Sequence, residues 1–318
     1  MTIPTYRDIE NAARLLYGHI IETPTVYTDV LSREFKADVY LKLESLQKTN
    51  SFKVRGSGVK ILSMSDEERQ RGIICASAGN HAQGVAYHAQ ALGIEATVVM
   101  PEPSPRVKII ATESYGAEVI LHGKIFDDAY AHAQKIAKEK KRAFVHPFND
   151  AHIIAGQGTV GLEVFNQVKN LDYIIVPIGG GGLMAGICIA IKSLNPKTRI
   201  IGVQTESAPN AHRTFYGKPT VSLKPSIAEG IAAKVPGDLC MRVIKKHVED
   251  IFTVKEDTIK IAINKLHAKQ KLVTEGAAAA SIAMMLENPD IFVGKRVCAI
   301  ISGGNIDPRR VSDIILND

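Results

Sequence analysis

Three short apolar runs in this chain each end in a turn built from glycine and small polar residues. The first run is followed by Ser77-Ala78-Gly79-Asn80-His81, the second by the four glycines 179–182, and the third by Ser302-Gly303-Gly304-Asn305. Strands that end in such turns present backbone N–H groups and short polar side chains at the carboxyl edge of a sheet, where open α/β folds bind ligands. The repeated pattern therefore predicts an α/β fold with a ligand site at the strand ends.

The rest of the chain alternates short apolar strands with amphipathic helices. This alternation is typical of βαβ units and mostly parallel sheets, and its length is enough for two sheets flanked by helices. The first helix has Thr5 and Asp8 as capping residues. We expect strands over 39–43, 73–76, 96–100, 118–121, 173–178, 199–204, 251–254 and 297–301, and helices over 6–16, 81–92, 105–115, 126–140, 151–168, 183–194, 256–269 and 275–286.

A chain of 318 residues can form two α/β domains. Pro147 and the polar pair Asn149-Asp150 mark one crossing between them, and Asn50-Ser51 mark the other. We therefore expect a large domain over 1–50 and 151–318, a small domain over 51–150, and a cofactor between the two. The sequence stops soon after Asp307, so no C-terminal regulatory domain is expected.

The stretch Ser51-Phe52-Lys53-Val54-Arg55-Gly56 places one lysine between an aromatic ring and a second cation, just before an expected helix. A neighbouring cation and partial burial both disfavour the ammonium form, so the Lys53 amine can attack an aldehyde and form an imine. Taken alone, these six residues are an ordinary basic turn, because the chain has 39 Lys and Arg residues. The glycine-rich turns are what favour a cofactor site.

Gly179 to Gly182 lie between an expected strand and an expected helix. Their N–H groups and the positive end of the helix can receive a phosphate dianion, and the backbone can approach it closely because no side chains intervene. A dinucleotide site is the alternative, because Gly180-x-Gly182-x-x-Ala185 fits G-x-G-x-x-A and Glu206 follows the next strand. That alternative leaves Lys53 and the other two turns unexplained.

The lysine motif, the S-A-G-N-H turn, the tetraglycine loop and the closing S-G-G-N together resemble the fold-type II pyridoxal-phosphate enzymes, whose fold is like that of the tryptophan synthase β subunit. The resemblance is greatest to the short, catabolic-type threonine (serine) dehydratases, with serine racemase as a near relative. It runs from the first helix to the last strand, and four motifs in the same order are more specific than any one of them.

This resemblance implies a role for each motif. Lys53 would carry pyridoxal 5′-phosphate as a Schiff base and then act as the catalytic base. The cofactor would be bound by Phe52 on the face of its ring, Asn80 at its 3′ oxygen, Gly179, Gly180, Gly181 and Gly182 at its phosphate, and Ser302 at its ring nitrogen. The substrate carboxylate would be bound by Ser77, Ala78, Gly79, Asn80 and His81. Without the resemblance, we would expect Ser77 to be a helix N-cap, His81 to be a partly exposed helix residue and Phe52 to be a core residue.

The implied activity is β-elimination of water from L-threonine or L-serine, which gives 2-oxobutanoate or pyruvate plus ammonia. Serine racemisation is the nearest alternative, but racemases of this family resemble S-S-G-N-H where this chain has Ala78, and a methyl group cannot relay a proton. An NAD-dependent oxidoreductase is the alternative from another class. The choice among threonine, serine and hydroxyaspartate stays open, because it depends on loops that form the pocket walls.

Other residues of interest have less specific patterns. Glu44, Arg55, Asn149 and Glu275-Gly276 are expected to shape the pocket or the domain interface, and His122, His146 and His152 lack metal-ligand spacing. No metal site is expected, because the residues where related serine racemases place an acid-rich divalent site are not carboxylates here. They are Gln204, Ala208 and Asn210.

Composition limits the partners. The formal charge is +6, but the basic residues are scattered and their one run, 138–142, ends an expected helix, so nucleic-acid binding is not expected. No apolar run reaches the ~18 residues of a membrane helix, and the first ten residues do not resemble a signal peptide, which favours a cytoplasmic protein. The four cysteines are expected to be free thiols. By resemblance, a homo-oligomer, either dimer or tetramer, and a nucleotide effector are expected.

Overall fold

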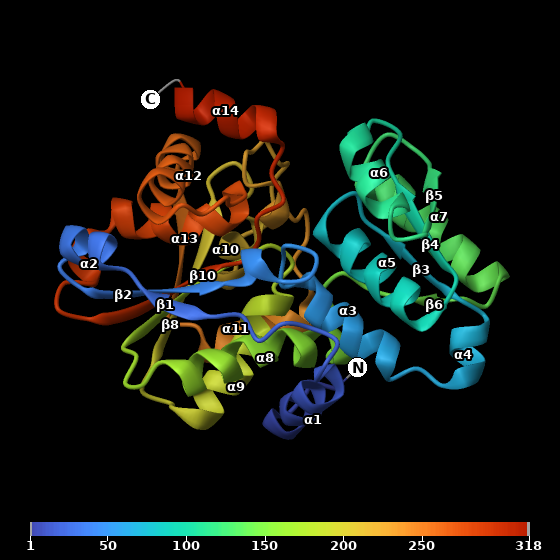
Figure 1. Ribbon diagram of the computed structural model, residues 1–318, viewed down its shortest axis with the longest axis horizontal. Helices are drawn as coiled ribbons and strands as arrows, with labels where there is room; N and C mark the ends of the chain where they lie inside the picture. Colours follow the sequence, from blue (N-terminus) through green and yellow to red (C-terminus); the bar gives the residue numbers. More distant parts are fainter. Residues whose placement is uncertain (1, 317–318) are drawn as a thin grey trace.

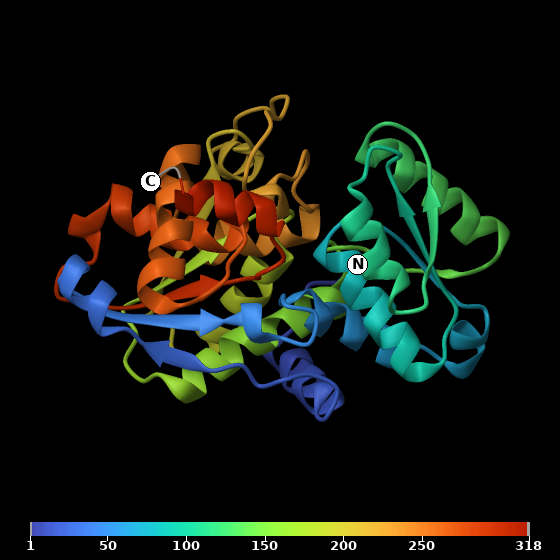
Figure 2. The ribbon, with the colours of Figure 1, turned by 45° about the horizontal axis from the view of Figure 1, so that its top comes forward.

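The computed structural model describes residues 2–316, and these residues form two sheets side by side with helices on both faces of each (Figure 1). The larger sheet has six strands and the smaller has four. The expected α/β architecture with two mostly parallel sheets is confirmed. Helix α3 (Lys53–Leu62) lies between the two sheets (Figure 2).

The six-stranded sheet has the order β1-β2-β10-β7-β8-β9, and only β1 at its edge is antiparallel. Its strands are β1 (Thr25–Tyr27), β2 (Asp38–Leu43), β7 (Tyr173–Pro177), β8 (Arg199–Thr205), β9 (Asp250–Val254) and β10 (Arg296–Ile301). One face packs on α1 (Tyr6–Leu16), α8 (Ala151–Gln167), α9 (Gly182–Leu194), α10 (Asn210–Phe215) and α11 (Asp238–His247). The other face packs on α2 (Asp29–Phe35), α12 (Glu256–Gln270), α13 (Gly276–Glu287) and α14 (Pro308–Leu316).

The four-stranded sheet is parallel, with the order β5-β4-β3-β6. Ile73 and Cys75 face one hydrophobic core, whereas Ile74 and Ala76 face the core on the other side, so the whole strand is apolar. Its strands are β3 (Ile73–Ala76), β4 (Ala96–Met100), β5 (Glu118–Leu121) and β6 (Ala143–Phe144). The helices of this unit are α4 (Asp66–Gln70), α5 (Asn80–Leu92), α6 (Arg106–Glu113) and α7 (Phe126–Glu139). Single 3₁₀ turns occur in the larger unit, at η1 (Glu44–Leu46), η2 (Glu229–Ile231) and η3 (Pro289–Ile291).

The expected strands and helices are present, with ends that differ by one or two residues. Helix α1 spans the expected residues, and its Thr5–Asp8 pair forms a reciprocal capping box. The sequence analysis missed β1, β6, α2, α4, α10, α11 and α14. Most of these elements are short, and their apolar periodicity extends over too few residues to be distinguished from loops.

Helices α8 and α9 cross with their backbones in contact. A Cβ atom added at Gly186 would lie 2.4 Å from the Gly158 amide nitrogen and 2.5 Å from the Ile154 carbonyl oxygen. No side chain can be accommodated at that distance, so the crossing requires glycine at position 186. The contact ties together the two helices that start beside the ligand cavity described below.

A buried group of charges joins α3 to the larger unit. Arg55 is fully buried, and its guanidinium is paired on one side with both oxygens of Glu44, at 2.7 and 2.8 Å. On the other side it is paired with both oxygens of Glu163 in α8, at 2.5 and 2.7 Å. Lys42 of β2 also pairs with Glu163, at 2.5 Å, so two cations balance two carboxylates. The paired charges fix α3 against β2 and α8.

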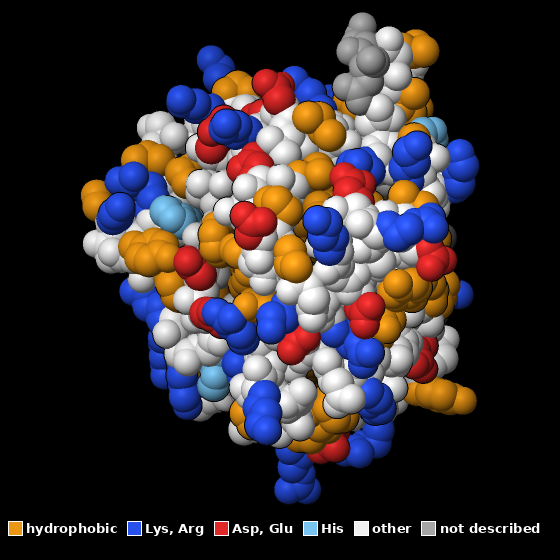
Figure 3. All heavy atoms as spheres, turned by 90° about the vertical axis from the view of Figure 1, so that its left-hand side faces the viewer, with side chains coloured by type: hydrophobic (Ala, Val, Ile, Leu, Met, Phe, Trp, Pro, Cys, Tyr) orange, Lys and Arg blue, Asp and Glu red, His pale blue; other side chains and the backbone are white. Residues whose placement is uncertain are grey.

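The charged surface is mixed on the face that is seen from the left-hand side of Figure 1. There, Lys and Arg side chains are interspersed with Asp and Glu side chains (Figure 3). Within residues 2–316, no helix combines the length and the apolar character that crossing a membrane requires.

Arg55→Ala should lower the free energy of unfolding by about 3–5 kcal/mol, because it leaves the fully buried Glu44 without its cation and leaves Glu163 with Lys42 alone. The measurement is denaturant unfolding of the cofactor-free protein. The matched control is Arg71→Ala, which breaks the Arg71–Glu67 pair on the surface and should cost less than about 1 kcal/mol. Equal losses in the two variants would contradict this account of the buried charges.

Candidate active site

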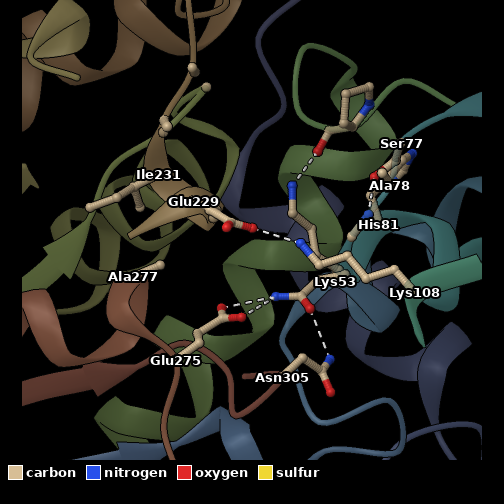
Figure 4. Close-up of a pocket in the computed structure, with 18 of the residues that line it drawn as sticks. Lys53, Ser77, Ala78, His81, Lys108, Glu229, Ile231, Glu275, Ala277 and Asn305 are labelled. Atoms are coloured by element: carbon tan, nitrogen blue, oxygen red, sulfur yellow. Dashed lines mark hydrogen bonds and ion pairs between the residues drawn. The ribbon is translucent and has the colours of Figure 1, made fainter. Parts of the chain in front are cut away.

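A cavity of about 1390 Å³ lies between the two sheets, at the carboxyl ends of β3, β7 and β10. The structure brings every predicted site residue to its wall. These residues come from four separate parts of the chain, and three of these parts are the strand-end turns of the sequence pattern. They are Phe52, Lys53, Ser77, Ala78, Gly79, Asn80, His81, Gly179, Gly180, Gly181, Gly182 and Ser302. Lys53, Ser77, Ala78 and His81 are labelled in Figure 4.

Lys53 is the first residue of α3, and its side chain reaches into the cavity (Figure 4). Its amine donates a hydrogen bond to the Pro147 carbonyl, at 2.8 Å, and lies 5.3 Å from the centre of the Phe52 ring. Burial lowers the pKa of Lys53 to about 8, although Cys240 and Glu275 oppose this shift. A substantial fraction of the amine is therefore neutral near physiological pH and can act as a nucleophile or a base.

Arg55 is not the cause of this lowered pKa, which corrects part of the sequence interpretation. Residues two apart on a helix point in nearly opposite directions, so Arg55 faces away from Lys53. Its charge is also balanced by Glu44 and Glu163. Burial lowers the Lys53 pKa, and Arg55 acts on the lysine only by fixing its helix.

The lysine segment is joined directly to the turn after β10. Ser51 forms a β-bridge with Gly303, and the Phe52 N–H donates to the Ser302 carbonyl at 3.1 Å. This pairing fixes Lys53 and Ser302 in position relative to each other, although they are far apart in sequence. The Ser302 hydroxyl is not used in the bridge and remains for a ligand.

The tetraglycine loop leads from β7 into α9. Gly181 has a φ of +96°, and α9 begins at Gly182 without a side-chain cap, so its first N–H groups are left for an external acceptor. A Cβ atom at Gly180 would lie 2.2 Å from the Phe148 ring. The loop therefore presents backbone N–H groups that an anion could accept from, with the Phe148 ring packed against it.

The turn after β3 differs from its simplest interpretation. Gly79, and not Ser77, is the N-cap of α5, and the Ser77 hydroxyl accepts from the Gly79 N–H at 3.2 Å. His81 is buried and not partly exposed, with Nε2 2.9 Å from the Val145 carbonyl oxygen. Burial, followed by the charge of Lys53, lowers the pKa of His81 to about 3, so the ring is neutral. Helix α5 thus starts at the cavity without a side-chain cap and can bind a carboxylate there.

Asn80 is held by a chain of hydrogen bonds. Its Nδ2 donates to both oxygens of Glu275, at 2.9 and 3.0 Å, and its Oδ1 accepts from Asn305 Nδ2 at 2.8 Å. Asn305 Nδ2 also donates to the Thr49 carbonyl, at 2.9 Å. Because the Thr49 carbonyl can only accept, Asn305 must present its Nδ2, and Asn80 in turn presents its Oδ1 to Asn305 and its Nδ2 to Glu275. Glu275 and Asn305 are labelled in Figure 4.

The carboxyl of Glu275 is electrostatically unusual. Burial raises its pKa to about 7, against the hydrogen bond from Asn80 and the charges of Lys108 and Lys53. No ion pair with Glu275 forms among the described residues, and the space around the carboxyl is narrow: a Cβ atom at Gly303 would lie 2.7 Å from its Oε1. From the sequence alone, Glu275 was expected only to shape the pocket or the domain interface.

Several other cavity residues were missed from sequence. Lys108 of α6 pairs with Glu229 of η2 across the cavity, at 2.6 Å (Figure 4). Phe148 and the Pro147 carbonyl also line the cavity, but the sequence analysis used this segment only to place a domain crossing. Asn305 is the exception with a sequence signal, because it closes the S-G-G-N turn.

The amides that replace carboxylates in the racemase-like metal region are used inside the protein. Gln204 donates to the Ile178 carbonyl at 3.0 Å and accepts from the His212 N–H at 2.8 Å. Asn210 donates to the carbonyls of Val221 and Lys234, both at 2.8 Å. Among the described residues, no three His, Cys, Asp or Glu side chains are grouped as metal ligands.

Comparison with known proteins gives a consistent result. The family of pyridoxal-phosphate dependent enzymes matches residues 16–303. L-threonine ammonia-lyase of Thermotoga maritima is 48% identical over 313 residues, which is 98% of this chain and 78% of that protein. Two solved structures are similar. Threonine deaminase isoform 2 of Solanum lycopersicum has a TM-score of 0.93 and 32% identity, and the match covers 97% of this chain and 92% of that one. Serine racemase of Dictyostelium discoideum has a TM-score of 0.89 and 35% identity, and the match covers 96% of this chain and 99% of that one.

The raised pKa of Glu275 makes stability depend on pH in a defined direction. The folded chain favours the protonated carboxyl, so this contribution is complete below pH 4.5 and is lost as the pH rises through about 7. Between pH 5 and pH 8, the wild type should therefore lose roughly 2–3 kcal/mol of unfolding free energy relative to Glu275→Gln. Denaturant unfolding of the cofactor-free proteins at both pH values measures this difference, and parallel profiles would refute the assignment.

Proposed function

The chain belongs to the family of pyridoxal-phosphate dependent enzymes, and we propose that it eliminates water from L-threonine or L-serine. The released enamine tautomerises to an imine, which water hydrolyses to 2-oxobutanoate or pyruvate plus ammonia. One combination of observations supports this activity most directly. Lys53 has a lowered pKa and Ala78 lines the same cavity, in a chain 48% identical to an L-threonine ammonia-lyase.

The cavity fits the cofactor of this family. A lysine whose amine is partly neutral lies beside an aromatic ring, as attachment to an aldehyde requires. The uncapped start of α9 leaves backbone N–H groups for an acceptor such as a phosphate, and the lack of a side chain at Gly180 leaves room for the Phe148 ring that packs against the loop. The free hydroxyl of Ser302 is a neutral partner for a ring nitrogen.

We assign the binding roles on this basis. Lys53 would be the attachment point, Phe52 would pack on the ring, Asn80 would face the 3′ oxygen and Gly179, Gly180, Gly181 and Gly182 would bind the phosphate, with Ser302 at the ring nitrogen. When bound, pyridoxal phosphate supplies an electron sink for the carbanion formed at the substrate Cα. A neutral serine at its nitrogen makes that sink moderate, which suits prompt loss of a β-leaving group.

The chain's own residues would bind and orient the amino acid. Ser77, Ala78, Gly79, Asn80 and His81 would hold its carboxylate at the start of α5, where N–H groups point outward. Once its amine is free, Lys53 would remove the α-proton, and the Pro147 carbonyl is placed to hold the resulting ammonium. Ala78 has no proton to deliver, so proton transfer would be confined to the lysine side.

Other parts of the proposal rest on the resemblance to this family. The domain division would follow the two sheets, with residues 1–50 and 151–318 in the large cofactor-binding domain and 51–150 in the small domain. Assembly as a dimer or tetramer, binding of a nucleotide effector and a cytoplasmic location also remain predictions. A substrate panel of threonine, serine and hydroxyaspartate, measured as 2-oxo acid release, would rank the substrates.

Because the chain belongs to the family of pyridoxal-phosphate dependent enzymes, its cofactor is pyridoxal phosphate and not the NAD that the oxidoreductase alternative required. Serine racemisation remains a second candidate, because a serine racemase structure aligns with 96% of this chain at a TM-score of 0.89. Racemisation needs an acid or base on each face of the substrate, and the methyl group of Ala78 is neither. This position favours elimination.

Lys53→Ala should lower 2-oxo acid release from L-threonine by roughly 10²–10⁴-fold or more, because the variant loses its base. It should also lose the visible absorbance of lysine-bound cofactor. Lys135→Ala, which changes an exposed lysine of α7, is the matched control and should keep both signals. Retained turnover in Lys53→Ala would sink the proposed role.

Ala78→Ser should raise D-serine formation from L-serine by about tenfold or more, because the new hydroxyl can carry a proton on the face opposite Lys53. D-serine and pyruvate are measured together by chiral chromatography and a 2-oxo acid assay. Dominant D-serine formation by the wild type would instead identify a racemase.

A further inference from the structure

The four residues His146 to Asn149 form a tight turn between β6 and α8. The N–H groups of Phe148 and Asn149 both donate to His146 Nδ1, at 3.1 and 2.8 Å. A side-chain acceptor that binds the amides two and three residues later is the geometry of an Asx turn, which Asp or Asn normally forms. Here a histidine ring nitrogen takes the place of the Asn or Asp oxygen.

This turn presents two groups to the cavity. The Pro147 carbonyl accepts the hydrogen bond from the Lys53 amine, at 2.8 Å. The Phe148 ring packs against the tetraglycine loop, where a Cβ at Gly180 would lie 2.2 Å from it. The same turn therefore determines the position of the lysine amine and of one wall of the phosphate site.

The far end of the turn is fixed to α11. Asn149 Nδ2 donates to Asp238 at 2.5 Å, and its Oδ1 accepts from the Leu239 N–H at 3.1 Å. The Phe148 carbonyl accepts from the Cys240 thiol, at 3.4 Å. These contacts hold residues 148 and 149 from outside, and His146 Nδ1 closes the turn from inside.

His146 must be neutral to do this. Burial lowers its pKa to about 4, with Lys53 acting in the same direction and Asp150 and Asp238 opposing it. Two donors on Nδ1 require a lone pair there, so the proton of the neutral ring is on Nε2. The ring also packs edge-on against Phe148, with centroids 4.8 Å apart.

We propose that His146 is a positioning residue whose Nδ1 holds the Pro147 carbonyl in place as the dock for the Lys53 amine. The inference rests on the proposed function, because the dock is used whenever the amine is not attached to the cofactor. The amine would be free in this way before the cofactor binds and while Lys53 acts as the base. A fixed carbonyl then stabilises the ammonium that Lys53 becomes when it takes the α-proton.

Two substitutions separate the acceptor from the ring. His146→Asn keeps an acceptor that can close the same Asx turn but removes the ring, whereas His146→Phe keeps the ring packing but has no acceptor. His132→Ala, on α7, is the control for loss of a histidine away from the turn. Because the two test variants alter different properties, a folding defect in one of them leaves the other informative.

The first measurement uses cofactor-free protein and does not depend on catalysis. Acetylation of Lys53 by N-hydroxysuccinimidyl acetate at pH 7.5 is followed by mass spectrometry, with Lys135 as the internal reference. An amine that loses its carbonyl partner has a lower pKa and moves more freely, so His146→Phe should be labelled at least about threefold faster. His146→Asn and His132→Ala should stay within about twofold of the wild type.

The second measurement is 2-oxo acid release from L-threonine by the cofactor-loaded proteins. His146→Phe should lose about tenfold or more in kcat with little change in KM, and His146→Asn should recover most of that loss. Faster labelling in His146→Asn than in His146→Phe, or unchanged labelling in His146→Phe, would overturn the proposal. A wild type that releases no 2-oxo acid would refute the proposed function while leaving the labelling result to decide the role of His146.

Discussion

The paired charges of Arg55 hold together the segments that the active site needs in fixed positions. The guanidinium lies between Glu44 after β2 and Glu163 on α8, while its own helix begins with Lys53. A buried arginine is tolerated only when its charge and its donors are matched, and here they are matched by two carboxylates. The attraction between these charges offsets the free-energy cost of burying them. The resulting geometry fixes the direction from which Lys53 enters the cavity.

From this fixed helix, the site is assembled by contacts between strand ends. The lysine segment bonds to the turn after β10, the turn after β7 rests on Phe148, and the turn after β3 reaches Glu275 through Asn80. Each turn leaves N–H groups or short side chains facing the same cavity. A ligand bound there would meet backbone N–H groups placed by the turns, and it would meet an Asn80 side chain that Glu275 and Asn305 orient.

The sequence predicted the parts of the site that follow from local pattern. The turns that hold Gly179 to Gly182 and Ser302 were expected at a ligand site because an apolar strand followed by a small-residue turn ends at the carboxyl edge of its sheet. Lys53 was singled out by its place between Phe52 and Arg55, and the family resemblance supplied the role of each residue. The direction of Arg55 was misjudged, because adjacency in sequence is not adjacency around a helix. The contact between Lys53 and Pro147 joins residues 94 apart, and no local pattern encodes it. Short elements such as β6 were missed for a related reason, since two residues carry no periodicity.

The crossing of α8 and α9 at Gly158 and Gly186 gives one side of the cavity a rigid frame. Both helices begin at the cavity, α8 after the His146 turn and α9 after the tetraglycine loop, and their backbones touch. Neither helix can slide along the other at this point without a backbone clash, so the His146 turn and the tetraglycine loop keep a constant separation. A ligand entering the cavity would therefore meet a wall whose shape is set in advance by two glycines that it never touches.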